Sequence, residues 1–494
     1  MRATHPHDPE GTADSMVEHH DGTQRPLTAI APDAILQPGR TCWRLESASR
    51  AAVLVDAADY FAALNVALEG ARHSVFILGW DFNHRIRLRP GVKGAPSLWR
   101  YLNRLVRRSK GLRVQVLKWD TPMIFEIRRR TIPFFLLNWL TLPRLKFRLD
   151  SDHPLTGSQH QKIVVIDDSV AFCGGIDLTD GRWDRSAHRH SDEWRVGPGG
   201  EGYSPVHDMM MMVDGDAARA LGDLARMRWQ RATGKILRPP PPTVAPWPTL
   251  AEPQFKNVKI GIARTEPAWD GHEGAREIEA LNLAALASAR RLVYIENQHF
   301  ASRVIFEAVR ALLQRPDGPE IVVVNPGKCP GWVEQFVMGE ARTQILAELR
   351  RADPFGRFRI YMPHCEDGTP IYVHSKCLIV DDHYLRVGSS NFNNRSMGFD
   401  KECDLALTAS TPEDKPIRHS IAWLRDALLA EHLGMPPEEL RAAVAACGSW
   451  VRAIDGARRT DGRSLSPIPQ PPDPSAGPIN DSILDPEHAN RLPL

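Results

Sequence analysis

The chain has 494 residues, of which 62 are lysine or arginine and 60 are aspartate or glutamate, so its formal net charge is +2. Hydrophobic residues make up 42% and charged residues 25%, which is typical of a soluble globular protein of roughly two to four domains. This balance excludes a uniformly basic coat for nucleic acid, and no run of about 18 apolar residues predicts a membrane-spanning helix. The seven cysteines are scattered and indicate neither a complete disulfide set nor a recognisable zinc motif.

Both ends of the chain and one internal segment are rich in proline. Residues 1–40 contain five prolines, and residues 461–494 contain eight in 34 positions, so both are predicted to lack regular structure. Four consecutive prolines, Pro239 to Pro242, indicate a semi-rigid linker. We therefore divide the chain into a flexible N-terminal segment (1–40), a first half (41–232), a Pro-rich linker (233–254), a second half (255–434), and a C-terminal helix with a Pro-rich tail (435–494).

The two halves look like copies of each other. In chain order, apolar and β-branched runs occur at 74–82, 112–120, 160–175 and 207–215, and similar runs return at 291–300, 319–327, 374–389 and 402–410. Such runs are typical of strands buried on both faces, and leucine-rich helical stretches lie between them. The pattern predicts an α/β protein with a duplicated domain: two mostly parallel or mixed sheets flanked by helices, related by a pseudo-two-fold axis, with an active site between the halves.

Two segments share the pattern H-x-K-x-x-x-x-D at equivalent places, and their residues are His160, Lys162 and Asp167 in the first half and His374, Lys376 and Asp381 in the second. Residues i and i+2 of a strand point to the same face, so the histidine and lysine of each motif are expected to share one site. An imidazole beside an ammonium suits a phosphodiester, because the lysine neutralises oxygen charge while the histidine does covalent or proton chemistry. Two facing units would let one histidine attack phosphorus while the other protonates the departing alcohol.

A turn of small residues follows each motif, and we predict that both turns bind phosphate. Glycine lets the backbone approach an anion, and serine or asparagine adds hydrogen-bond donors. The predicted turn residues are Gly174 and Gly175 in the first half and Gly388, Ser389, Ser390 and Asn391 in the second.

A nucleophilic histidine needs an acceptor at its other ring nitrogen. The candidates are Glu402, 28 residues after His374, and Asp208, 48 residues after His160, because both begin equivalent strands. Strict strand alternation places Asp167 and Asp381 on the pleat opposite the lysines, so these motif aspartates are predicted to be structural.

These residues closely resemble the phospholipase D superfamily, whose members carry the H-x-K-x-x-x-x-D motif twice on a duplicated α/β fold. The likeness covers about residues 50–433 and is strongest in HQKIVVIDDSVAFCGGIDLTDGRWD (160–184), YIENQHF (294–300), SSNFNNRSMGFDKECDLAL (389–407) and EHLG (431–434). The first of these blocks looks like that of the phosphatidylcholine-hydrolysing members.

The resemblance implies a ping-pong phosphodiesterase that needs no metal or other cofactor. By motif position, His160 would be the nucleophile that forms a phosphohistidine, and His374 the general acid and later base. Lys162, Lys376 and Asn391 would bind the phosphate. The first half has Asp177 where the second has Asn391, so the phosphate-binding role does not transfer to Asp177. The sequence before the body is too short for the calcium-binding or phosphoinositide-binding modules of plant and animal relatives, and none is expected.

Residues 128–148 form the most unusual segment outside the motifs. Ile132 to Leu142 are nearly all apolar, include Trp139, and are flanked on both sides by arginine or lysine. Eleven residues cannot span a bilayer but can lie in the interface of an anionic membrane. A buried helix or an interdomain contact explains the segment equally well. The polar N-terminus is unlike a signal peptide, so we expect a cytoplasmic protein at the membrane periphery, although signal-independent export stays compatible with the sequence.

The leading hypothesis is a phospholipase D that hydrolyses the head-group phosphodiester of a glycerophospholipid, or exchanges the head group for another alcohol. The alternatives are a phospholipid synthase-type transferase or a nuclease of the same superfamily. The near-neutral charge and the 12 lysines against 50 arginines disfavour a nucleic-acid partner. A non-enzymatic lipid-binding scaffold is disfavoured because both His-Lys pairs are intact. The expected partners are a phospholipid and, transiently, a membrane surface, and a monomer is expected because one chain carries both motifs.

Overall fold

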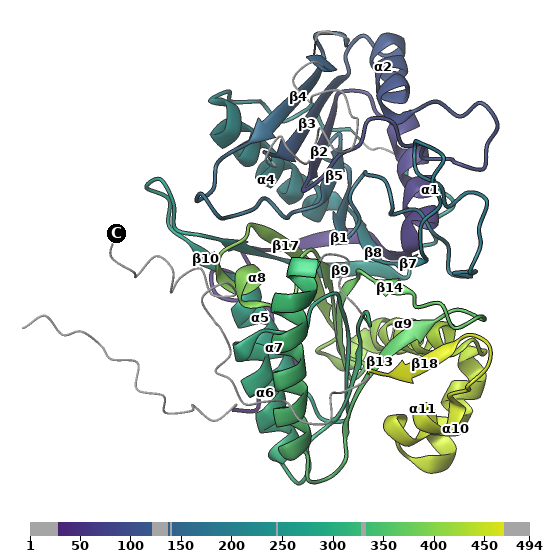
Figure 1. Cartoon of the computed structure of the whole chain (residues 1–494). Helices are drawn as coiled ribbons and strands as arrows, with labels where there is room; N and C mark the ends of the chain where they lie inside the picture. Colours follow the sequence, from purple (N-terminus) through teal and green to yellow (C-terminus); the bar gives the residue numbers. More distant parts are fainter. Residues whose placement is uncertain (1–27, 121–136, 139–140, 244–245, 328–331, 469–494) are drawn as a thin grey trace, which may run out of the picture.

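A computed structural model describes residues 28–120, 137–138, 141–243, 246–327 and 332–468. All but two of the described strands form one 16-stranded mixed sheet that runs through both halves (Figure 1). The first half contributes seven strands: β1 (Arg44–Val55), β2 (Ser74–Gly79), β3 (Arg113–Trp119), β4 (Leu145–Asp150), β5 (Ile163–Ile166), β6 (Val170–Gly174) and β8 (Met209–Asp214). The second half contributes β9 (Phe255–Glu266), the short β10 (Ala275–Arg276), β11 (Leu292–Asn297), β12 (Glu320–Val324), β13 (Phe358–His364), β15 (Lys376–Val380), β16 (Tyr384–Gly388), β17 (Glu402–Thr408) and β18 (Ser464–Pro467).

The order of the strands displays the duplication directly. From its edge inward the first half reads β4-β3-β2-β5-β6-β8-β1, and the second reads β13-β12-β11-β15-β16-β17-β9, with β18 added outside β13. The two series meet where β1 pairs antiparallel with β9, from Arg44 opposite Ile262 to Ala51 opposite Phe255. A separate parallel pair, β7 (Val206–His207) with β14 (Tyr372–Val373), also joins the halves.

The prediction of two mostly parallel or mixed sheets is therefore only partly right. Parallel pairing in the large sheet is confined to β2-β3-β4 and β11-β12-β13, and the strands between these groups pair antiparallel. The two sheets merge because the long strands β1 and β9 would otherwise leave open edges, and pairing them satisfies both rows of backbone groups.

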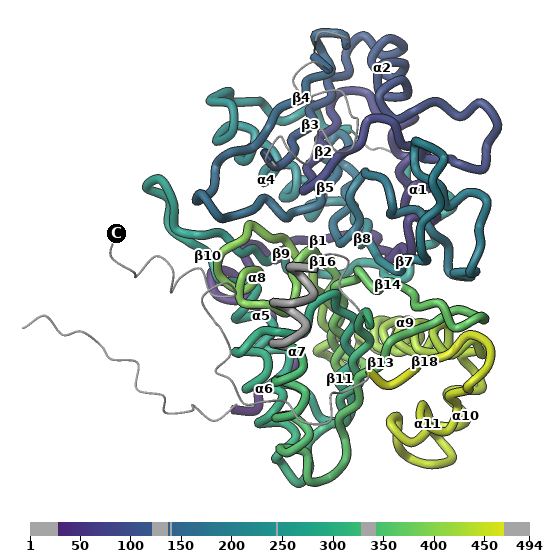
Figure 2. Tube along the Cα trace, in the orientation of Figure 1, coloured from purple at the N-terminus to yellow at the C-terminus, as the bar shows by residue number. Residues whose placement is uncertain are grey.

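The helices pack around this sheet, with the first half above the second in Figures 1 and 2. They are α1 (Asp56–Glu69), α2 (Leu98–Arg108) and α4 (Gly215–Thr233) in the first half, and α5 (Glu277–Ala287), α6 (Arg303–Gln314), α7 (Trp332–Arg351), α8 (Asn394–Gly398), α9 (Lys415–Leu433), α10 (Pro437–Cys447) and α11 (Trp450–Ala457) in the rest of the chain. Among the described helices, none is both long and apolar enough to cross a membrane.

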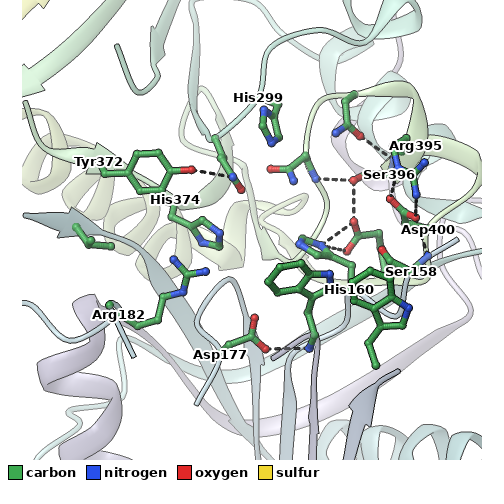
Figure 3. A pocket seen from close by; sticks show the side chains of 18 of the residues that line it. Ser158, His160, Asp177, Arg182, His299, Tyr372, His374, Arg395, Ser396 and Asp400 are labelled. Carbon is green, nitrogen blue, oxygen red and sulfur yellow. Dashed lines mark hydrogen bonds and ion pairs between the residues drawn. The ribbon is translucent and has the colours of Figure 1, made fainter. Parts of the chain in front are cut away.

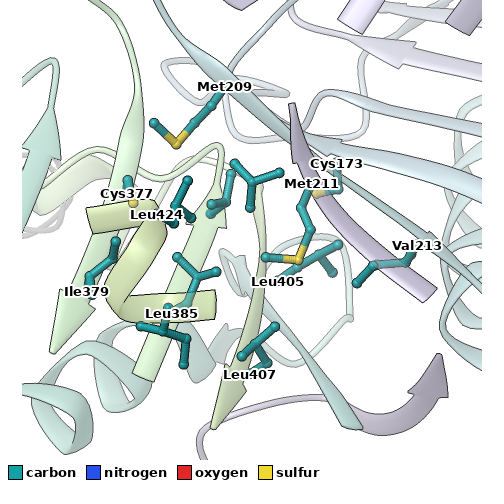
Figure 4. Close-up of a cluster of buried hydrophobic side chains, with 14 of the residues drawn as sticks. Cys173, Met209, Met211, Val213, Cys377, Ile379, Leu385, Leu405, Leu407 and Leu424 are labelled. Atoms are coloured by element: carbon teal, nitrogen blue, oxygen red, sulfur yellow. The ribbon is translucent and has the colours of Figure 1, made fainter. Parts of the chain in front are cut away.

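One hydrophobic cluster spans the junction of the halves and holds the motif strands in place. Met209 and Met211 of the first half pack in it with Leu405 and Leu407 of the second (Figure 4). The four residues of β5 are all buried, with Ile163 and Val165 in this shared cluster and the other two in a cluster of the first half. The motif strands are thus buried on both faces, which fixes the residues that precede and follow them.

The segments outside the halves are partly packed against them. Ile35 is fully buried in the hydrophobic cluster of the second half, so the expectation of a flexible segment over 1–40 is wrong at that residue. An apolar side chain next to a proline-rich stretch still stabilises the fold when it finds a hydrophobic surface. In the linker, Trp247 is buried against the first half and Arg50 stacks on its ring. Most of the apolar segment 132–142 lies outside the described residues.

Candidate active site

The two motif histidines precede β5 and β15, and the opposite half holds each of them in place. The backbone N–H of His160 donates to the carbonyl of Lys401 at 2.9 Å, and that of His374 donates to the carbonyl of His207 at 2.7 Å. The side chain of each motif histidine also contacts a carboxylate of the opposite half. Nδ1 of His160 lies 2.9 Å from both carboxylate oxygens of Glu402, and Nδ1 of His374 lies 2.6 Å from Oδ2 of Asp208.

Both candidate acceptors from the sequence therefore contact a motif histidine, and each serves the histidine of the other half. Spacing along the chain could not reveal this crossing, because it follows from the junction of β1 and β9. A hydrogen bond from Nδ1 to a carboxylate fixes the ring orientation and leaves Nε2 free for chemistry. The carboxylate of Glu402 also accepts hydrogen bonds from Ser389 Oγ at 2.5 Å and Ser396 Oγ at 2.7 Å, which hold it in turn.

His160 and His374 line one pocket of about 570 Å³ (Figure 3). Its wall contains carboxylate, amide, hydroxyl and guanidinium groups beside several aromatic rings. The lining residues outside the two motifs include Trp80, Trp119, Asp177, Arg182, Tyr203, Gln298, His299, Tyr372, Asn391, Asn393, Arg395, Ser396 and Glu402. The arrangement brings together two imidazoles, cationic groups and hydrogen-bond donors, which is what a phosphodiester requires.

The two motif lysines are buried next to the pocket but are not part of its wall. Each donates to the backbone carbonyl of its own motif histidine. Their other partners differ, because Lys162 Nζ lies 3.3 Å from Oδ2 of Asp177 whereas Lys376 Nζ donates to Oε1 of Gln298 at 2.9 Å. Asp177 is held in place by the backbone N–H groups of Trp80 and Asp81.

Burial dominates the electrostatics of the site. Burial, together with the charges of Lys162 and Lys376, holds the pKa of His160 well below its usual value. The pKa of His374 is likewise lowered by burial and by Lys376 and Arg182. Burial raises the pKa of Asp208 to about 6 and that of Glu402 well above its usual value. Neutral imidazoles are favoured in the free protein, so each ring keeps a lone pair on one nitrogen.

The prediction of two phosphate-binding turns is largely wrong. Of the predicted turn residues, only Asn391 lines the pocket, and Gly174, Gly175, Gly388, Ser389 and Ser390 are not part of its wall. Gly175 is needed because a Cβ there would overlap the carboxylate of Asp208, and one on Gly388 would overlap that of Asp404. The small residues let neighbouring strands and their carboxylates approach closely, and at Gly175 that carboxylate is the partner of His374.

The motif aspartates occupy matching structural positions, both with positive φ (51° at Asp167 and 52° at Asp381). The carboxylate of Asp167 accepts from the backbone N–H groups of residues 72, 73 and 74 at 2.7–2.8 Å. The carboxylate of Asp381 accepts from residues 290, 291 and 292 at 2.8–3.0 Å. In each half the aspartate caps the chain that enters the neighbouring strand, β2 or β11.

Several pocket residues were not predicted from sequence. Trp80 directly follows β2, and Trp119 is the last residue of the neighbouring parallel strand β3. The carboxyl ends of parallel strands meet at one edge of a sheet, which brings the two residues together. Their rings stack with centroids 5.6 Å apart. Arg182 and His299 lie in the GRWD and YIENQHF segments, whose resemblance was noted without a role for either residue.

Comparison with known proteins agrees with this geometry. A family profile described as "Phospholipase D" matches residues 364–460. The chain is 26% identical to phospholipase D A of Dictyostelium discoideum over 475 residues, covering 78% of this chain and 35% of that protein. It is also 26% identical to phospholipase D alpha 1 of Zea mays over 512 residues, covering 75% of this chain and 63% of that protein. The chain thus spans between about a third and just under two thirds of these curated relatives.

A phosphatidylserine synthase from Haemophilus influenzae has a similar fold, with a TM-score of 0.52 and 12% identity over 82% of this chain and 95% of that one. The duplicated motifs, the distant relatives and the paired histidines in one pocket together identify the chain as a member of the phospholipase D superfamily, with the site of a phosphodiesterase-type enzyme.

Proposed function

We propose that the protein is a phospholipase D, which cleaves the head-group phosphodiester of a glycerophospholipid and leaves phosphatidic acid. The observation that carries this proposal is the pair of imidazoles in one pocket, each bound through Nδ1 to a carboxylate of the opposite half. Two such groups can divide a displacement at phosphorus between nucleophilic attack and proton transfer.

The reaction proceeds in two displacements. In the first, Nε2 of His160 attacks phosphorus, the bond from phosphorus to the head-group oxygen breaks, and His374 donates a proton to the departing alcohol. The anionic diester favours this protonated His374, because a negative charge beside the ring opposes the effect of burial on its pKa. In the second, His374 takes a proton from water, whose oxygen attacks the phosphohistidine and frees His160. An alcohol in place of water gives a phosphatidyl alcohol.

The surroundings of the histidines favour an amphiphilic diester. Trp80, Trp119, Tyr203 and Tyr372 give the wall of the pocket apolar surface beside its charged groups. The volume of about 570 Å³ is in the range of small-ligand sites and suits the phosphoglycerol and head group of one lipid. A net charge of +2 offers little of the phosphate attraction on which nucleic-acid binding depends.

The proposal includes a transient contact with the membrane surface. The basic flanks and apolar centre of residues 128–148 have the composition of a segment that lies in an anionic lipid interface. Charging Phe135 and Trp139 is expected to weaken sedimentation with anionic liposomes and to spare hydrolysis of a soluble diester. Unchanged sedimentation of the double variant would assign the membrane contact to another part of the chain.

The deciding experiment offers phosphatidylcholine vesicles, a soluble aryl phosphodiester and single-stranded DNA to the wild type and to His160→Ala and His374→Ala. We expect choline release by the wild type and its loss in both variants. Added ethanol, glycerol or serine, with mass spectrometry of the lipids, distinguishes hydrolysis from transfer to an alcohol. Cleavage of DNA without lipid turnover would replace the proposal by a nuclease, and choline release undiminished in either variant would contradict the two-histidine reaction.

A further inference from the structure

A second group of ionisable side chains lies close to the active site but outside its pocket. It consists of Asp56 at the start of α1, His188 in the loop after the GRWD segment, His207 in β7 and Glu431 near the end of α9. The first three are buried, and the side chain of Glu431 is 17% exposed. None of the four lines the catalytic pocket. The chemistry of the proposed reaction therefore leaves their purpose unexplained.

The distances within this group are those of a coordination sphere. Nε2 of His188 and Nδ1 of His207 are 3.3 Å apart. His188 Nε2 lies 3.2 Å from Asp56 Oδ2 and 3.4 Å from Glu431 Oε1, and His207 Nδ1 lies 3.3 Å and 3.7 Å from oxygens of the same two carboxylates. In a tetrahedral zinc site with bonds of about 2.0–2.1 Å, neighbouring ligand atoms are about 3.3 Å apart.

The protons on the two imidazoles are directed away from this group. Nδ1 of His188 is 3.0 Å from Asp184, whose carboxylate also accepts from Arg195 and from the backbone N–H of Val206. Nε2 of His207 is 2.8 Å from Glu296. An ionised carboxylate can only accept a hydrogen bond, so Nδ1 of His188 and Nε2 of His207 are the donating nitrogens.

A neutral imidazole that donates through one nitrogen has a lone pair on the other. A metal ion would use these lone pairs on His188 Nε2 and His207 Nδ1, the nitrogens that face each other and the oxygens of Asp56 and Glu431. Oε1 of Glu431 also accepts from the guanidinium of Arg463 at 3.1 Å. Oδ2 of Asp56 accepts no hydrogen bond although Asp56 is 1% exposed. A cation at the centre satisfies all four atoms, and an outer carboxylate on each histidine is the usual arrangement around a bound metal.

We propose that Asp56, His188, His207 and Glu431 bind one divalent metal ion of the zinc type. Two imidazole nitrogens and two carboxylate oxygens in a tetrahedral arrangement suit Zn²⁺, whereas Ca²⁺ and Mg²⁺ prefer six or more ligands that are mainly oxygen. With four protein ligands the coordination is closed, which is typical of a structural site.

The neighbouring cluster around Glu296 differs from this group and does not resemble a metal site. The Glu296 carboxylate accepts from Tyr294 OH, Ser375 Oγ and His432 Nε2 as well as from His207. Donors already satisfy both of its oxygens. Glu296 therefore orients His207, whereas Oδ2 of Asp56 in the other group is buried without a hydrogen-bond donor.

The metal would stabilise the junction of the two halves next to the catalytic partners. Three ligands come from the first half, and Glu431 comes from the second. His207 is followed directly by Asp208, the partner of His374. The backbone carbonyl of His207 accepts from the backbone N–H of His374. An ion bound to His207 would hold this strand without touching the substrate.

Metal content of the full chain tests the proposal, in protein whose N-terminal histidines, His5, His7, His19 and His20, are replaced by alanine so that they do not compete. We expect one zinc ion per chain after dialysis, and a visible cobalt(II) spectrum of tetrahedral type after exchange. Zinc is expected to raise the Tm of the metal-stripped protein, whereas magnesium and calcium are not. His188→Gln and Asp56→Asn should lose the ion, and so should Glu431→Gln, the partly exposed ligand whose loss disturbs the core least. His190→Gln, an exposed histidine two residues from His188, is the matched control and should keep the ion.

The proposal is overturned if folded, metal-stripped protein takes up neither zinc nor cobalt at micromolar concentrations, which would mean that doubly protonated histidines hold the cluster together. Equal zinc content in Glu431→Gln and the wild type would also overturn it. These readouts are metal content, spectrum and Tm, so they stand independently of the lipid activity.

Discussion

The two halves hold their motif lysines against different partners. In the first half Lys162 lies beside the carboxylate of Asp177, and in the second Lys376 donates to the amide of Gln298. A carboxylate cancels the charge of an ammonium, whereas an amide leaves it in place. Below its lowered pKa of about 7, Lys376 therefore offers a phosphate an ammonium group in the half that also provides the amide of Asn391. The comparison teaches that the two copies have kept one scaffold while the surroundings of their motif lysines have diverged.

The largest expected effect comes from removing the histidines one at a time. His160→Ala and His374→Ala should each lower phosphatidylcholine turnover by about 10⁴-fold or more. They should differ with an aryl phosphodiester, whose leaving group needs no proton. His374→Ala should release one equivalent of the aryl alcohol and retain the phosphoryl group on His160, which mass spectrometry of peptides detects. An adduct on His374 in the reciprocal variant, and none on His160, would reverse the assignment of the halves.

The crossed carboxylates provide the next test. Glu402→Gln should slow the first, rapid release of aryl alcohol (the burst) by about 10²-fold, because Glu402 supports His160, the proposed attacking ring. Asp208→Asn should leave that burst within a few-fold and slow the subsequent turnover, because it supports His374. Stopped-flow measurement separates the two phases. Asp223→Asn, which removes ion pairs with Arg44 and Arg226 outside the pocket, is the control. Equal effects of both variants on the burst would show that the carboxylates do not act through separate histidines.

A smaller effect is expected from pH, through the lysine of the second half. Burial and the charge of Lys162 lower the pKa of Lys376 to about 7, against the opposing effect of Asp208. Its ammonium is present below this pH and is lost above it, so kcat/KM should fall by up to about tenfold per unit as the pH rises through 7. Because the pKa of His160 is held well below its usual value, the acid limb should lie below pH 6.5. Lys376→Arg keeps the charge and should remove this contribution to the alkaline limb, so that a remaining fall reports loss of the proton from His374, the proposed general acid. A flat kcat/KM between pH 6 and 9 would contradict this role.

The smallest effect on activity is expected from the motif aspartates. Asp167→Ala or Asp381→Ala leaves three backbone N–H groups without their acceptor, which should lower the free energy of unfolding by about 1–3 kcal/mol. Activity at low temperature should stay within about threefold. Urea unfolding measures the loss, and the matching geometry predicts similar values for the two halves. A much larger loss of activity than of stability in either variant would place that aspartate in the chemistry.

The sequence predicted the duplication and the residues at the centre of the site, because buried strands and a repeated motif are local patterns. Glu402 and Asp208 were found because each begins a strand at the same place in its half. Their crossed pairing was not found, because it depends on β1 meeting β9, a long-range contact without a local pattern.

The small residues after the motifs were misread for a different reason. Glycine and serine serve equally well where a backbone approaches an anionic ligand and where it approaches a carboxylate of the next strand. Only the structure shows that Gly175 faces Asp208 and that Ser389 binds Glu402. The four residues of the proposed metal site come from distant parts of the chain, so no spacing rule of the usual zinc motifs applies to them.

The exchange of carboxylates between the halves bears on the origin of the molecule. A chain severed in the linker would give two fragments, each with an imidazole but with its acidic companion on the other piece, and function would return only when the fragments reassociate. An ancestor with a single motif would have faced the same constraint and worked only as a symmetric pair of subunits. A duplication that joined two such subunits in one polypeptide would preserve the exchange of carboxylates and leave each copy free to diverge.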